Sequence, residues 1–194
     1  MKITFRDNSG MRGDTARATL TRGIGWGLIG GFAGTLVMDL LLTGIFSMLG
    51  KPALTCFSIV GDTLGRFLLL LGTETAGSIP LGVATHYVVG PTVGAIYGVV
   101  VTQFKALRVS TQKRCIMLAV LYVELLSQPL LAMTPILLKM TKLETLEWFG
   151  GSFVMHFILG IVLGLVMSYG LYRKPGKHPI HFYTNSSDFF RLDF

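Results

Sequence analysis

Charged residues are scarce in this chain of 194 residues: they make up 14% of it, against about 25% in a typical soluble domain. Hydrophobic residues make up 51%, and the mean hydropathy is +0.62. This composition excludes an ordinary soluble domain and predicts an all-α integral membrane protein. The net charge of +7 does not indicate a nucleic-acid partner, because the basic residues flank apolar runs, as membrane topology requires.

Cysteine and recognisable catalytic motifs are also rare or missing. The two cysteines, Cys56 and Cys115, have no C-x-x-C neighbour and are interpreted as small apolar fillers. The sequence contains no Walker loop, dinucleotide fingerprint or nucleophile elbow. We therefore assign no catalytic residue and do not expect an enzyme with a soluble active site.

Four apolar runs are long enough to cross a bilayer core of about 30 Å, which needs about 20 residues. They predict a four-helix transmembrane bundle over residues 23–172, with spans at about 23–49, 81–104, 115–138 and 149–172. Prolines 129 and 135 predict a bent or partly unwound outer half of the third span. Residues 1–22 and 173–194 are expected to be cytoplasmic tails.

The stretch 57–71 is apolar but short, and it carries Asp62 and Arg66, which could pair four residues apart. It predicts an interfacial or re-entrant helix between the first two spans. Thirteen Lys and Arg residues fall on the side of the tails and of the 105–114 loop, and four fall on the other side. This bias places both termini in the cytoplasm, with the chain in the cell (inner or plasma) membrane.

Glycines recur at helical spacing in three of the spans. Small residues four apart allow helix backbones to approach closely. The predicted packing positions are Gly27, Gly31, Gly34, Gly90, Gly94, Gly160 and Gly164. The second and fourth spans share the pattern H-x-x-x-G-x-x-x-G, headed by His86 and His156, so two similar helical hairpins are expected.

Each span contains one ionisable residue, and a glutamine lies one turn from the third. The set is Asp39, His86, Glu124, Gln128 and His156. At a rise of about 1.5 Å per residue these side chains are expected to converge in the outer half of the membrane. A charge there costs about 2.5–3.5 kcal/mol, so such groups usually pair or serve a function.

Four interpretations of this cluster remain open. The residues could be mutual structural partners. Asp39, His86, Glu124 and His156 could instead bind iron, manganese or zinc. His86 and His156 could ligate a haem, with Gly90 and Gly160 leaving room for its ring. A path for protons or a small solute is the fourth.

Short motifs in all four spans resemble a family of small four-span bacterial membrane proteins of unknown function. They are Gly34-Thr35-Leu36-Val37-Met38-Asp39, the stretch from Gly50-Lys51-Pro52 to Gly65-Arg66, His86-Tyr87-Val88-Val89-Gly90, Gln128-Pro129, and His156 with Gly160. The resemblance implies the fold and the polar set, and it implies no reaction.

Three functions follow as hypotheses. The first is a non-catalytic subunit or assembly factor of a larger membrane complex, in contact with lipid and with other membrane subunits or further copies of itself. The second is a redox protein that holds a metal or haem in the polar cluster. The third is a proton-coupled carrier.

Overall fold

The computed structural model describes residues 9–104, 107 and 111–172, and these form α-helices with no strand among them. The helices are α1 (Ser9–Met48), α2 (Thr55–Leu70), α3 (Ile79–Gln103), α4 (Gln112–Leu138) and α5 (Lys142–Tyr172). The predicted cytoplasmic tail 173–194 lies outside the described residues. Four of the helices are long and apolar enough to cross a membrane, which confirms the predicted all-helical class with four candidate spans.

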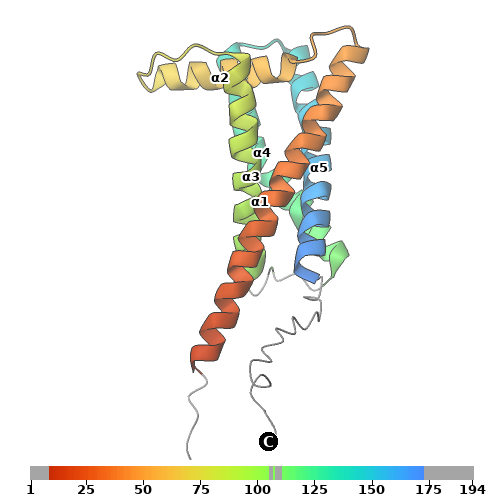
Figure 1. Ribbon diagram of the computed structural model, residues 1–194. Coiled ribbons are helices and arrows are strands. Elements are labelled where there is room, and N and C mark those ends of the chain that lie inside the picture. Colours follow the sequence, from red (N-terminus) through yellow and green to blue (C-terminus); the bar gives the residue numbers. More distant parts are fainter. Residues whose placement is uncertain (1–8, 105–106, 108–110, 173–194) are drawn as a thin grey trace, which may run out of the picture.

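The four long helices run side by side, and α2 lies across one end of them (Figure 1). The start of α1 and the end of α5 lie at the opposite end from α2. α1 packs against both α3 and α5, and α5 also packs against α4. The bundle is therefore a curved row of helices in which α3 and α4 contact each other far less than the other neighbours do.

Two helices extend beyond the predicted spans. The first span was expected from about residue 23, and α1 is already helical from Ser9. The fourth span was expected from about residue 149, and α5 begins at Lys142. Thr141 and Glu144 form a capping box there: the Glu144 carboxylate accepts from Thr141 N at 2.7 Å, and Thr141 Oγ1 accepts from Glu144 N at 3.3 Å.

The expected unwinding of the third span does not occur, because α4 continues through both prolines. Pro135 lacks the N–H that would bond the carbonyl of Leu131 one turn earlier. The indole of Trp148 on α5 donates to that carbonyl at 3.2 Å. A neighbouring helix thus satisfies the backbone group that the proline frees, as membrane helices require.

The expected pair of Asp62 with Arg66 is also replaced by other contacts. Arg66 donates instead to the carbonyl of Leu137 at 3.1 Å, which ties α2 to the end of α4. Asp62 accepts from the hydroxyl of Ser58 at 3.4 Å. The Arg66 contact thus ties α2 to α4, and α2 also packs against α3.

Glycines join α1 to α3 along one continuous seam. A Cβ added at five of these six glycines would collide with backbone atoms of the facing helix, and one added at Gly90 would collide with the side chain of Thr35. The facing pairs are Gly23 with Gly98, Gly27 with Gly94, and Gly31 with Gly90. The partners advance by four residues in opposite directions, so the two helices are antiparallel and in fixed register.

The remaining predicted packing glycines lie at the other two helix interfaces. Gly34 faces Leu159 of α5, while Gly160 and Gly164 of α5 face Val120 and Ile116 of α4. At six of the seven predicted positions a Cβ would have too little room, and at Gly34 it would fit tightly against Leu159. Across the more open α3–α4 interface, Tyr97 donates to the carbonyl of Cys115 at 2.7 Å, and Tyr122 donates to that of Val93 at 3.2 Å.

Replacing glycines of α1 by alanine should distinguish the effect of close helix packing on stability from the effect of helix propensity. Gly27→Ala places a methyl group against the backbone of Gly94, and such overpacking costs about 1–3 kcal/mol. Gly25 lies two residues away on the same helix, with nothing within 4 Å of its added Cβ. Gly25→Ala should therefore be neutral or stabilising by up to about 1 kcal/mol. Unfolding by SDS in mixed micelles measures both, and equal effects would contradict the seam.

Candidate functional site

Asp39 of α1 and His86 of α3 form a hydrogen-bonded pair inside the bundle. The Nδ1 of His86 lies 2.8 Å from Oδ1 of Asp39, and Asp39 is only 5% exposed. The glycine seam places them together, because it brings the backbones of α1 and α3 into contact just before this level. A carboxylate accepts hydrogen bonds, so the geometry assigns the Nδ1 proton of His86 to this contact.

α2 covers this pair. The ring of Phe57 packs on the imidazole of His86, with ring centroids 5.2 Å apart. The adjacent thiol of Cys56 is buried, and this burial, together with the negative charge of Asp39, raises its pKa to about 12. The pair is thus enclosed by three helices, and α2 shields it at the end of the bundle.

His156 of α5 makes a different contact. Its Nδ1 lies 2.7 Å from the carbonyl oxygen of Ser152, one turn earlier on the same helix. A carbonyl oxygen can only accept, so Nδ1 of His156 carries a proton and, in the neutral ring, Nε2 carries the lone pair. No carboxylate among the described residues bonds to this ring.

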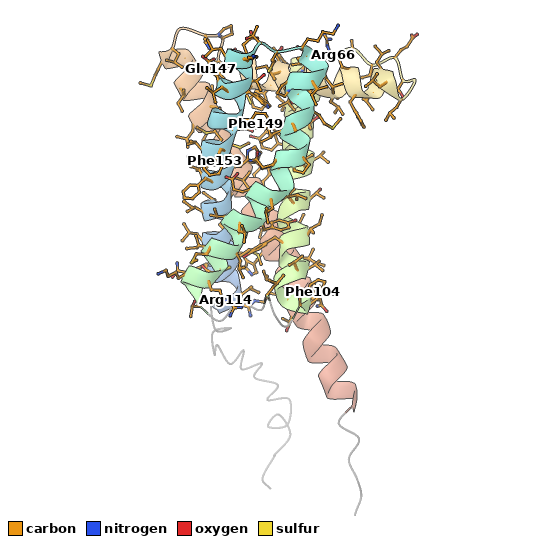
Figure 2. All side chains as sticks on the ribbon, turned by 180° about the vertical axis from the view of Figure 1, so that it is seen from behind. Arg66, Phe104, Arg114, Glu147, Phe149 and Phe153 are labelled. Atoms are coloured by element: carbon orange, nitrogen blue, oxygen red, sulfur yellow. The ribbon has the colours of Figure 1, made fainter. Side chains whose placement is uncertain are left out.

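Glu124 and Gln128 face a groove between α4 and α5 that opens outward. Gln128 Nε2 donates to Glu124 Oε2 at 3.1 Å, while Glu124 Oε1 is buried without a hydrogen-bond partner in the described part of the chain. The groove has a volume of about 440 Å³, and Phe149 and Phe153 form its α5 wall (Figure 2). Its α4 wall includes the exposed Leu125.

The structure therefore divides the predicted cluster. Asp39 and His86 pair, His156 bonds its own helix, and Glu124 with Gln128 lies on the outward groove. No group of three or more His, Cys, Asp or Glu side chains in the described ranges is arranged to hold a metal ion. The four-ligand metal set is thus not assembled, because helix rotation turns Glu124 away from the two histidines.

The room expected for a haem ring is also filled. Thr35 of α1 occupies the space beside Gly90, and Val120 of α4 occupies the space beside Gly160. The small residues at these positions admit neighbouring helices and leave no slot for a macrocycle. A haem between His86 and His156 would need these helix contacts to open.

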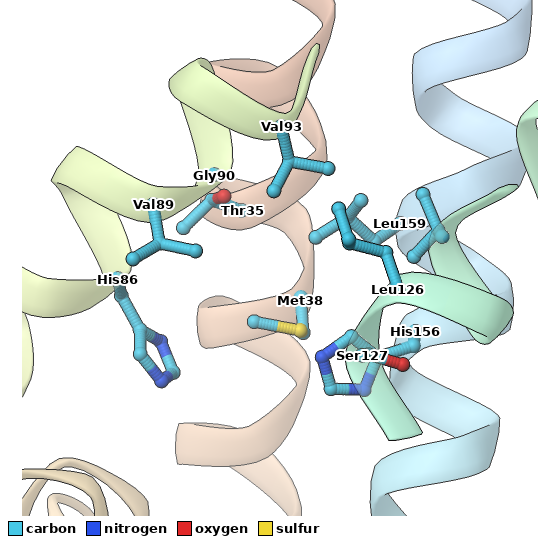
Figure 3. Close-up of a pocket in the computed structure, with 11 residues that line it drawn as sticks. Thr35, Met38, His86, Val89, Gly90, Val93, Leu126, Ser127, His156 and Leu159 are labelled. Carbon is cyan, nitrogen blue, oxygen red and sulfur yellow. The ribbon is translucent and has the colours of Figure 1, made fainter. Parts of the chain in front are cut away.

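A small cavity of about 90 Å³ lies between the four long helices (Figure 3). Both histidines line it, together with Thr35, Met38 and Ser127. The Thr35 hydroxyl oxygen is buried and has no hydrogen-bond partner among the residues described. Sequence reasoning gave none of these three residues a role in a site, although Thr35 and Met38 belong to the motif that carries the resemblance, because threonine, methionine and serine are common in membrane helices and give no distinct signal.

A double-mutant cycle tests the Asp39–His86 pair. Replacing one partner leaves an uncompensated buried group, so Asp39→Leu and His86→Leu should each lose about 3–5 kcal/mol of unfolding free energy. The double variant removes both polar groups and should lose less than the worse single variant. SDS unfolding measures all three, with Val88→Leu on the exposed face of α3 as control. Simple additivity would contradict a direct pair.

Thiol labelling tests the cover that α2 provides. With its pKa raised to about 12, about one Cys56 thiol in ten thousand is ionised at pH 8, against about one in ten at the usual 9.0. N-ethylmaleimide should therefore leave Cys56 unmodified in the folded protein and label it after SDS unfolding. A Thr73→Cys variant, in the exposed linker after α2, provides the reactive control. Labelling of folded Cys56 at the control rate would contradict the packing.

Comparisons with known proteins identify no relative of this chain. No family model, curated protein or solved structure matches the chain. The resemblance to small four-span bacterial membrane proteins therefore stays a prediction. Function must be argued from the bundle, its polar groups, the groove and the cavity.

Proposed function

We propose that this chain is a non-catalytic subunit or assembly factor of a larger membrane complex. One observation carries the proposal: Glu124, a carboxylate in the middle of an apolar helix, lines a groove that opens outward, with Gln128 of its own helix as hydrogen-bond donor. Intramembrane ionisable residues normally face the bundle interior and find a partner there. Here the partner is expected from outside the chain.

The groove around Glu124 suits a transmembrane helix of another subunit. Its walls are apolar, with Leu125 and Phe153 67% and 53% exposed, and its two polar side chains lie together on α4. A basic side chain on the partner, Lys or Arg, would compensate the charge of Glu124. The partner is thus a helix with one basic residue among apolar ones.

The proposed setting is the cell membrane, with both termini in the cytoplasm. This orientation rests on the excess of Lys and Arg on that side. The start of α1 and the end of α5 lie at one end of the bundle, as an even number of crossings requires. α2, at the other end, then lies along the outer membrane surface.

The other two predicted functions have less support. A carrier was favoured by an interrupted third span, and α4 is continuous. A metal or haem site built on both carboxylates and both histidines was favoured by their convergence, and they are divided between separate contacts.

Photo-crosslinking from the native membrane tests the groove. A photoreactive residue at Phe153 should form one discrete adduct, which mass spectrometry should map to a transmembrane helix containing Lys or Arg. Glu124→Leu should reduce this adduct at least about 10-fold, because loss of a charged hydrogen-bond partner costs about 1.5–3 kcal/mol. Replacing the partner's basic residue should do the same.

Two matched controls accompany this experiment. Glu147→Leu removes a carboxylate outside the groove and should leave the adduct intact. A photoreactive residue at Leu36, on an exposed part of α1, should not capture the same helix. Adducts with lipid alone, with a second copy of this chain, or with a helix lacking a basic residue would each contradict the proposal.

A further inference from the structure

The two histidines of the central cavity are held in the same chemical state. Each ring uses Nδ1 for a fixed contact, to Asp39 Oδ1 at 2.8 Å in His86 and to the Ser152 carbonyl at 2.7 Å in His156. Each ring therefore has Nε2 left for a ligand. Metal-binding histidines commonly show this arrangement, in which a carboxylate or a backbone carbonyl orients the ring through its other nitrogen.

Met38 provides a third donor atom in the same cavity. Its thioether lies between the two imidazoles in the view of the lining residues (Figure 3), and its side chain is buried. His86 and His156 both line this space. Two imidazole side chains and one thioether side chain, supplied by three helices, therefore border one small volume.

From this juxtaposition we propose that the cavity binds one soft monovalent cation, Cu(I), through Nε2 of His86, Nε2 of His156 and Sδ of Met38. Thioether sulfur is a soft ligand that selects Cu(I), and imidazole also suits copper. The site differs from the cluster predicted from sequence, because Met38 replaces both carboxylates as ligand. It is also independent of the groove around Glu124.

The charges around the cavity favour a monovalent ion. Asp39 does not line the cavity, but it bonds the far side of the His86 ring and supplies one negative charge. One positive charge on the metal and one negative charge on Asp39 leave the site neutral, which matters in a medium where unpaired charge is costly. A divalent ion would leave a net charge, and hard cations prefer oxygen ligands to sulfur.

Competition for Cu(I) in detergent tests the site. Purified protein with ascorbate should withdraw one Cu(I) per chain from bicinchoninate, which is followed by its visible absorbance. Met38→Leu should weaken binding at least about 10-fold, and His86→Ala or His156→Ala at least about 100-fold. All samples carry His178→Ala and His181→Ala, so that these two imidazoles, outside the described residues, cannot contribute.

Met167→Leu is the matched control for Met38→Leu. Met167 is fully buried on α5 and does not line the cavity, so its replacement should leave Cu(I) affinity unchanged. Gel filtration and SDS unfolding of the metal-free variants confirm that each is folded. X-ray absorption should show sulfur and nitrogen neighbours of copper, with the sulfur lost in Met38→Leu and the nitrogens kept.

Two results would overturn the proposal. One is the absence of competition at any protein concentration. The other is Cu(I) binding that survives Met38→Leu together with His86→Ala and His156→Ala, because the metal would then be held elsewhere. Loss of binding in folded variants, with Met167→Leu unaffected, supports it.

Discussion

The close approach of α1 and α3 is the constraint on which the rest of the structure depends. Three pairs of glycines leave no room for side chains between the two backbones, so the register of the helices is fixed at this seam. One turn further on, that register places Thr35 beside Gly90 and sets Asp39 opposite His86. Membrane helices cannot rely on expulsion of water to associate, and close backbone contact supplies the packing energy instead. The seam thus determines both the fold of the first hairpin and the position of its Asp39–His86 pair.

The second hairpin, formed by α4 and α5, repeats the glycine packing of the first but not the pairing of its acidic residue with its histidine. In α5, as in α3, a histidine precedes two glycines four residues apart, and these glycines pack on the preceding span, here α4. The acidic residues behave differently. Asp39 bonds the histidine of its own hairpin, whereas Glu124 bonds Gln128 and faces the outer groove. Gln128, one turn away on the same helix, offers Glu124 a local donor, and His156 is occupied by the carbonyl of Ser152. Two similar halves therefore carry different chemistry, one enclosed and one open to a neighbour.

The features that could be predicted from the sequence are those that depend on a local pattern of residues within one helix. Apolar length predicted the four candidate spans, glycine spacing predicted the packing positions, and the position of 57–71 predicted a short helix between the first two spans. Convergence of the polar cluster could not be predicted, because each residue turns a helix by about 100°, and a small rotation decides whether a side chain faces inward or outward. The capping box Thr141–Glu144 was readable and would have placed the start of α5 correctly. The contact of Trp148 with the carbonyl freed by Pro135 was not readable, because it joins two helices whose packing no local pattern specifies.

Buried oxygens without a hydrogen-bond donor destabilise the folded chain and mark places where a further binding partner would be favourable. Among the described residues, three buried side-chain oxygens lack a hydrogen-bond partner: one each on Thr35, Asp39 and Glu124. In water such atoms would be solvated, but the bilayer core has no water to replace a missing partner, and each unsatisfied group costs several kcal/mol. Thr35 borders the central cavity and Asp39 supports one of its histidines, while Glu124 borders the outward groove. Since the rest of the bundle is closely packed, these costs are concentrated at the cavity and the groove. A cation in the cavity would compensate the charge of Asp39, and a basic residue of a partner helix in the groove would compensate that of Glu124, so each would lower the free energy of the folded state.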